Sequence, residues 1–161
     1  VWSDKKRISL KKDGIKNDTT RILKNQEFIS QRYKLKAQIF LDINPSGEGL
    51  QHYSACLFDV YDSFYNIPEE PVTNCFMNIY FDLVEIERRK MEKVISQNNF
   101  SLSQFDSLYQ NTIKILEKQS EDYFGEVSRG KNLNALEKWN FTVKQNLGID
   151  NFEMFGVSKP K

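Results

Sequence analysis

The order of hydrophobic patterns along the chain restricts its fold more than any other feature. Apolar and polar residues alternate from Tyr33 to Ile43, which is typical of a half-buried strand. From about residue 74 onward, apolar residues instead recur at the spacing of helices. Because strand patterns come first and do not alternate with helix patterns, the sequence predicts an α+β fold, with helices packed on a small antiparallel or mixed sheet.

A β-hairpin is expected around residues 44–49, where one Pro and two Gly supply turn chemistry. The following run, from Leu50 to Tyr61, is apolar on both faces. Such a run predicts a strand inside the sheet, covered from both sides. A weaker strand is expected near residues 7–11.

Three helices are expected in the second half, at about 74–97, 101–125 and 132–147. Thr73 or Asn74 is the expected N-cap of the first helix, because both side chains accept hydrogen bonds from free backbone N–H groups. Gly148 follows the third helix directly and is favourable just past a helix end. The tail beyond it keeps Phe152 and Phe155, so it is expected to pack.

Length and charge exclude several classes of function. The chain has 161 residues, the size of one domain, so residues 1–161 are expected to form a single domain. With 23 Lys and Arg against 22 Asp and Glu, the net charge of +1 gives no long-range field for nucleic acid. The basic residues between Lys5 and Lys12 are typical of a solvated edge or tail. No apolar run approaches the roughly 20 residues of a membrane helix.

The cysteines and the single histidine do not form a zinc motif. Cys56 and Cys75 are too far apart for C-x-x-C spacing, and His52 is the only histidine. A structural zinc site is therefore not expected. Two buried free thiols and one disulfide remain alternatives, with the free thiols favoured.

Five short segments follow one another in a distinctive order: Trp2-Ser3, Phe58 to Phe64, Tyr80 to Glu85, Tyr123 to Gly130, and Trp139-Asn140. In this order the chain resembles a poorly characterised family of bacterial secreted zinc-dependent peptidases. In that family an early Trp-Ser segment and a β-rich half precede a helix of pattern H-E-x-x-H-F-D, followed by a T-x-H-G segment and a W-N pair. The likeness spans most of the chain and implies a zincin-like scaffold.

The same resemblance implies that the metal ligands have been lost. Residues four apart on a helix project from one face, so two imidazoles can share a zinc while the intervening Glu polarises the metal-bound water. This chain has Phe76, Met77 and Tyr80 at those positions, and Arg129 at the T-x-H-G histidine. A phenol with an ordinary pKa near 10 is a poor ligand, and a permanent guanidinium charge repels a cation. No catalytic residue, metal or cofactor is therefore expected.

Three polar residues remain as candidates for a displaced site: Asp82, Glu85 and His52. Carboxylates one turn apart on a helix are usually solvated or hydrogen-bonded, and a lone histidine is usually structural. If these three residues shared one metal ion, their side chains would have to lie within about 7 Å of one another, given bond lengths of about 2 Å.

Three hypotheses about function follow. The first is a non-catalytic, metal-free peptidase-like domain of the bacterial cell envelope or periplasm, with a binding or structural role and an envelope protein or peptide as partner. The start at Val1 rather than Met suggests that a leader has been removed. The second is a metal-dependent hydrolase with a displaced site around His52, Asp82 and Glu85. The third is an α+β interaction module unrelated to the family.

Overall fold

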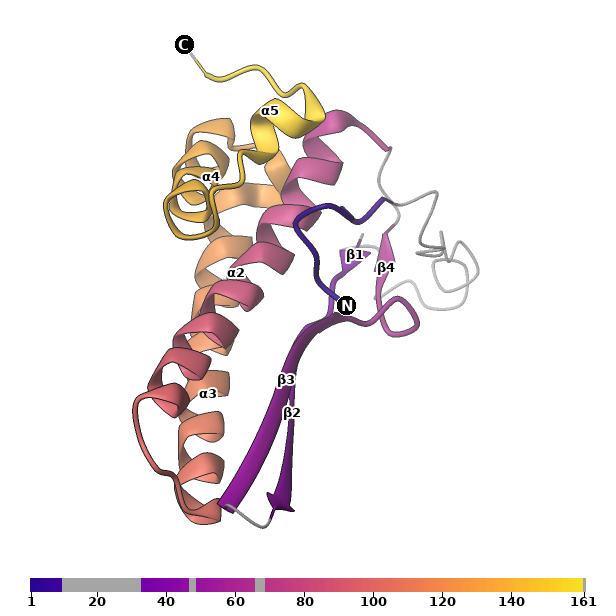
Figure 1. Cartoon of the computed structure of the whole chain (residues 1–161). Coiled ribbons are helices and arrows are strands. Elements are labelled where there is room, and N and C mark those ends of the chain that lie inside the picture. The colour runs from indigo at the N-terminus through magenta and orange to yellow at the C-terminus, as the bar shows by residue number, and fades with distance from the viewer. Residues whose placement is uncertain (10–32, 47–48, 66–68, 161) are drawn as a thin grey trace.

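The computed structural model describes residues 1–9, 33–46, 49–65 and 69–160 (Figure 1). In chain order its elements are β1 (Tyr33–Lys34), β2 (Ala37–Ser46), β3 (Gly49–Phe58), β4 (Phe64–Tyr65), α2 (Pro71–Ser96), α3 (Leu102–Val127), the 3-10 turn η2 (Ser128–Gly130), α4 (Leu133–Leu147) and α5 (Asn151–Phe155). Strands precede helices, so the predicted α+β class is confirmed. Within the described ranges, no helix has a stretch long and apolar enough to cross a bilayer.

The strands form two antiparallel pairs rather than one sheet. β2 and β3 make a hairpin whose register runs from Ala37 opposite Phe58 to Ser46 opposite Gly49, and β1 pairs separately with β4. The strand predicted at 33–43 is therefore interrupted between β1 and β2. Of the strand predicted near residues 7–11, residues 7–9 are not a strand, and the remainder lies outside the described residues.

β3 does not lie inside a sheet, so that prediction is wrong. Among the described strands, β3 pairs only with β2. Its inward face carries Cys56, which is 1% exposed, and its outer edge receives a backbone hydrogen bond from Trp2 N to Cys56 O at 2.8 Å. On its outward face Tyr53 contacts Phe40 of β2, with ring centroids 6.5 Å apart. A cross-strand aromatic pair thus accounts for Phe40 and Tyr53, which are 46% and 59% exposed.

α2 is the central element of the molecule. The β2–β3 hairpin, α3, α4 and α5 all contact it, and Figure 1 shows α2 and α3 running side by side along the molecule, with the hairpin beside them. Every residue from Cys75 to Glu87 is buried. Although Glu87 begins a run of four charged residues, it is buried and accepts a hydrogen bond from Lys90 Nζ at 2.7 Å. A helix surrounded by neighbours has no single polar face over this stretch.

The start of α2 differs from the prediction. It begins at Pro71 with Glu70 at the N-cap, not at Thr73 or Asn74. Proline is well tolerated there because the first N–H groups of a helix lack intrahelical partners and the fixed φ of proline suits the first turn. A proline that marks a break in the sequence pattern is therefore the first residue of the helix.

The later helices agree better with their predicted bounds. α3 follows Ser101, whose backbone N–H donates to Gln104 Oε1 at 2.8 Å as in a capping box. It continues through Gly125 to Val127, so Gly125 is not its end. α4 ends at Leu147, directly before Gly148, as predicted. Gly148 has a left-handed backbone conformation. The tail packs through α5.

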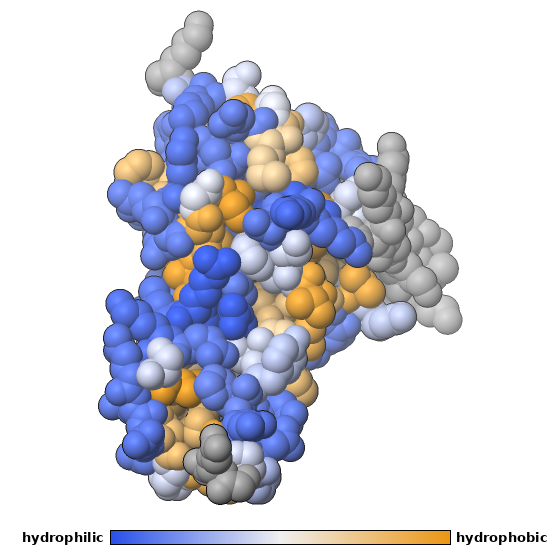
Figure 2. All heavy atoms as spheres, in the orientation of Figure 1, coloured by the Kyte–Doolittle hydropathy of each residue, from blue (hydrophilic) through white to orange (hydrophobic). Residues whose placement is uncertain are grey.

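Polar side chains cover most of the face shown in Figure 2, with apolar side chains in separate patches between them. The core lies beneath this face, where α2 meets β2, β3 and α3.

Gly130, the last residue of η2, packs against the first turns of α2. Its φ is +83°, and a Cβ atom there would lie 3.2 Å from Val72 Cγ2 and 3.6 Å from Phe76 Cβ. Gly148 has a similar φ of +74°, but a Cβ atom there would meet nothing within 4 Å. The two glycines therefore separate the cost of a left-handed backbone from the cost of close packing.

We expect Gly148→Ala to lower the free energy of unfolding by about 1 kcal/mol, because alanine is strained in the left-handed region. Gly130→Ala should cost about 1 kcal/mol more, because its Cβ also pushes Val72 away. Urea denaturation of the two variants measures this difference. Equal losses would show that η2 is not closely packed on α2.

Candidate functional site

Phe76 and Tyr80 lie one turn apart on α2 and pack against the same two aromatic residues of α3. The Phe76 ring stacks on Tyr123 with centroids 5.5 Å apart and an interplanar angle of 14°. Tyr80 packs on Phe124 with centroids 4.8 Å apart. Phe76 is 0% exposed and Tyr80 6% exposed. The face that would carry two histidines in the peptidase pattern is thus filled by interlocking rings.

The polar atoms of this aromatic cluster already have partners. Tyr123 Oη donates to the Phe76 backbone oxygen at 2.7 Å, and Tyr80 Oη accepts from Ala37 N at 3.2 Å. Burial raises the pKa of both phenols, that of Tyr123 well above its ordinary value. Tyr33 closes the cluster with its ring edge-on to Phe76 at 5.5 Å. The two phenols are therefore neutral at physiological pH and do not act as phenolate ligands.

Met77 and Arg129 occupy the other two positions of the pattern. Met77 is 0% exposed and belongs to the core. Arg129 has a left-handed φ of 64° and precedes Gly130, whose backbone approaches Phe76. Burial raises the pKa of the Tyr33 phenol, and the positive charge of Arg129 acts in the opposite direction. The structure therefore brings Phe76 and Tyr80 into one cluster, and the segment of Arg129 lies against the end of that cluster nearest Phe76.

Each retained polar residue already has protein partners: Arg88 connects Glu85 to the group of Ser54, Glu92 and His52, whereas Asp82 pairs with Arg7. His52 Nε2 lies 2.8 Å from Glu92 Oε2. Glu85 accepts from Arg88 at 2.7 and 2.8 Å and from Arg89 at 2.9 Å. Among the residues that the structure describes, no three His, Cys, Asp or Glu side chains are arranged to hold a metal ion. The structure does not bring His52, Asp82 and Glu85 together.

Glu92 links His52 to α2. Burial alone would raise the pKa of this carboxyl, but hydrogen bonds from Ser54 and His52 and the charge of Arg88 outweigh burial and lower the pKa. Arg88 Nη1 also donates to Ser54 Oγ at 2.9 Å. These contacts hold β3 on α2, which accounts for His52 as a structural residue.

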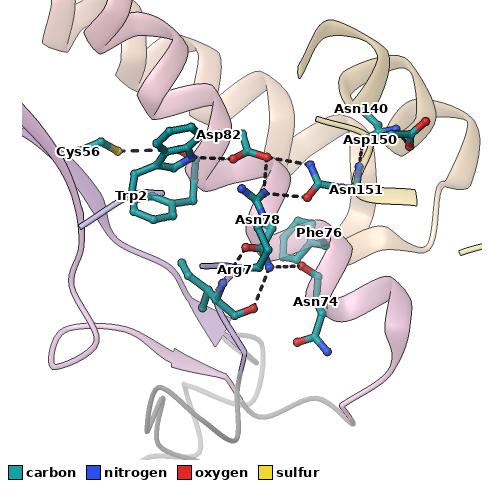
Figure 3. A network of polar contacts seen from close by, with 12 residues as sticks. Trp2, Arg7, Cys56, Asn74, Phe76, Asn78, Asp82, Asn140, Asp150 and Asn151 are labelled. Atoms are coloured by element: carbon teal, nitrogen blue, oxygen red, sulfur yellow. Dashed lines mark hydrogen bonds and ion pairs between the residues drawn. The ribbon is translucent and has the colours of Figure 1, made fainter. Parts of the chain in front are cut away.

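Asp82 lies at the centre of a buried polar network that joins distant segments of the chain (Figure 3). Its Oδ1 accepts from Trp2 Nε1 at 2.8 Å. Its Oδ2 accepts from Arg7 Nη2 at 2.5 Å and from Asn151 Nδ2 at 2.8 Å. The Asp82 side chain is 0% exposed and that of Arg7 9% exposed, so the ion pair is buried. Arg7 Nη2 also donates to Asn151 Oδ1 at 2.8 Å, which ties the three residues together.

Two asparagines extend this network to other segments. The Asn78 side chain accepts from Ile8 N and donates to Ile8 O, both at 2.8 Å, and so pairs with the backbone as a strand would. Asn140 Oδ1 accepts from Asn151 N at 2.9 Å. Side-chain contacts of α2 and α4 therefore hold the N-terminal segment and α5 in place.

Sequence patterns did not reveal this network. Arg7 was assigned to a solvated basic segment; that prediction is wrong, because its guanidinium is buried against Asp82. One signal was present: Asp82 interrupts the apolar run from Ile79 to Val84. A carboxylate at such a position must be paired when the run is buried, although its partners could not be named.

Asp150 is the N-cap of α5. Its Oδ1 accepts from Phe152 N at 3.1 Å and from Asn140 Nδ2 at 2.9 Å, while Oδ2 lies 3.0 Å from Lys144 Nζ. Burial alone would raise the pKa of this carboxyl, but these contacts and a backbone hydrogen bond from Glu153 lower it to about 2. The charged form of Asp150 is therefore favoured in the folded chain.

Cys56 and Cys75 are free and buried, which agrees with the favoured alternative. Cys56 Sγ lies 3.9 Å from the Phe81 backbone oxygen. Burial raises the pKa of both thiols well above their ordinary value. Neither thiol is therefore activated as a nucleophile or metal ligand.

Comparison of the chain with protein-family models, with curated protein sequences and with solved structures gave no match.

Asp82→Asn should destabilise the fold by about 3–5 kcal/mol, because it leaves the Arg7 charge buried without a counter-ion. Asp62→Asn is the matched control, since Asp62 pairs with Lys34 and Lys36 at the surface and its side chain is 42% exposed. The control should change the free energy of unfolding far less. Chemical denaturation distinguishes the two; equal effects would mean that the Asp82 network contributes nothing special.

Asp150→Asn should lower the free energy of unfolding by about 1 kcal/mol at pH 7, because asparagine keeps the cap but loses the charge. The folded pKa of Asp150 is lower than its ordinary 3.8, so its contribution is full above about pH 4 and is lost as the pH falls toward 2. Denaturation curves of both proteins between pH 2 and 7 should therefore converge at low pH. A gap that persists at pH 2 would contradict the assignment to this carboxyl.

Proposed function

We propose that this chain is a non-catalytic, metal-free peptidase-like domain of the bacterial cell envelope or periplasm, with a binding or structural role. One observation carries the proposal: at the positions where the peptidase pattern has its two helical histidines, the chain has Phe76 and Tyr80, packed into a closed aromatic cluster. The bacterial origin and the envelope location follow from the sequence resemblance alone.

The residues at the four positions of the pattern do not fit a zinc ion. Phe76 has no lone pair, and Tyr80 is a buried phenol with a raised pKa. Met77 cannot take a proton from water, and Arg129 adds a permanent positive charge beside the cluster. No catalytic step is therefore assigned to these residues.

Energetics favours the aromatic residues in such a position. Burial of each large apolar side chain contributes about 1.5–3 kcal/mol, and aromatic pairs add about 0.5–1.5 kcal/mol. Polar ligands without their metal would instead be buried groups with unsatisfied hydrogen bonds. Once the metal was lost, a filled cleft would be more stable than an empty one.

The alternative of a displaced metal site is supported less well. Each of its three residues already has short contacts: His52 with Glu92, Asp82 with Arg7, and Glu85 with Arg88. To bind a common ion, they would first have to give up these partners.

The proposal predicts that protein purified without chelator holds less than about 0.1 zinc per chain by elemental analysis. Approximately one zinc per chain, removed by chelator together with a peptidase activity, would overturn the proposal.

A gain-of-ligand variant tests the origin of the site. Phe76→His, Tyr80→His and Arg129→His together restore three zinc ligands, if these positions share one neighbourhood. Leu102→His with Asp106→His is the control, an exposed pair four residues apart at the start of α3. We expect added zinc to raise the melting temperature of the triple variant more than that of the control. If the control responds as strongly, these positions do not form a former metal site.

A further inference from the structure

An open pocket of about 660 Å³ lies where the first turn of α2 meets η2 and the C-terminal tail. Val72, Leu133 and Val157 supply apolar walls, and three charged residues, Arg129, Lys131 and Glu70, line the same pocket. In Figure 1 this is the end of the molecule where α2 begins and the chain leaves α5. A pocket of this size suits a small molecule or the end of a peptide.

Within the part of the chain that the structure describes, neither cation of the pocket is paired with a carboxylate. No described side chain forms an ion pair or hydrogen bond with the guanidinium of Arg129 or the ammonium of Lys131. By contrast, Arg7 and Arg88, the other buried or half-buried arginines among the described residues, are each paired with a carboxylate. Arg129 is half-buried, and its charge also opposes the burial-induced rise in the pKa of Tyr65. A half-buried guanidinium without an anion is a binding group for an anion that comes from outside.

The N-terminus of α2 adds partial positive charge to the pocket. α2 starts there, and Glu70 at its N-cap makes no side-chain cap hydrogen bond. The first turn of α2 contains no acidic residue. The partial positive charge of this helix end therefore adds to that of Arg129 and Lys131. The exposed carboxylate of Glu70 contributes negative charge to the same pocket.

We propose that this pocket binds a carboxylate joined to a branched aliphatic group, the chemistry that the C-terminus of a peptide ending in leucine or valine presents. A guanidinium donates two parallel hydrogen bonds to a carboxylate, which a neutral amide cannot replace. Phosphate alone would leave the apolar walls of Val72, Leu133 and Val157 uncovered. This inference deepens the binding role proposed above, and depends on it only for the expectation that the chain binds rather than cleaves its partner.

The test uses the full chain in chelator-treated buffer and two probes of equal shape, N-acetyl-leucine and N-acetyl-leucinamide. NMR titration should give a dissociation constant of about 1 mM for the acid and one at least ~10-fold weaker for the amide. Equal affinity for acid and amide, or no binding of the acid, would overturn the assignment.

A third probe, 4-methylpentanoate, has the same aliphatic acid without the peptide bond. If it binds much more weakly than N-acetyl-leucine, the natural ligand is a peptide; if it binds equally, the acyl chain with its carboxylate is sufficient.

Arg129→Gln should weaken binding of N-acetyl-leucine by about 10-fold, whereas Lys118→Gln, which removes one exposed charge from α3, should leave it unchanged. Val157→Glu keeps Arg129 and places a negative charge at the pocket in the tail beyond α5, so it should reduce binding similarly; because Val157 is half-buried against the core, denaturation checks that this variant is folded. If Val157→Glu and a folded Arg129→Gln both bind the acid as the wild type does, the pocket is not the site. Zinc content, measured on the same samples, decides the proposed function separately from these affinities.

Discussion

The buried carboxylate of Asp82 is the constraint on which the rest of the structure depends. Removal of a charge from water costs several kcal/mol unless donors replace the water, and here the donors come from Arg7, Trp2 and Asn151. Arg7 is 75 residues and Asn151 69 residues away in the chain. One charge on the central helix therefore requires both distant segments to pack against α2, which positions the N-terminal segment and α5.

Side chains of α2 are buried in two different ways, by hydrogen bonding in one part of the helix and by aromatic packing in another. Around Asp82, hydrogen bonds satisfy both carboxylate oxygens, whereas around Phe76 and Tyr80 aromatic rings fill the space and leave few polar atoms to satisfy. Near the end of the aromatic region, the left-handed turn at Arg129 places a cation that no described carboxylate pairs with at an open pocket. The proposed binding role rests on this charge beside the cluster.

Local patterns predicted elements well where one face is buried and the other is wet. The alternation around Ile39 and the helical spacing from Leu133 to Leu147 both correspond to observed elements. Patterns failed where neighbours surround an element, as at Glu87, or where pairing is decided by distant strands, as for β3. That Phe76 and Tyr80 share neighbours could be foreseen from their spacing alone, whereas the closeness of Gly130 to Phe76 could not.

The sequence by itself determined the α+β order, most helix bounds and the absence of ordinary zinc ligands at the positions of the peptidase pattern. These properties depend on residue type and on spacing within a few turns, which local sterics and hydrophobic periodicity govern. Only the tertiary structure decided which donors satisfy Asp82 and which of the described cations find a carboxylate. Such partners are selected by the packing of segments far apart in the chain, and no local pattern encodes the distances between them.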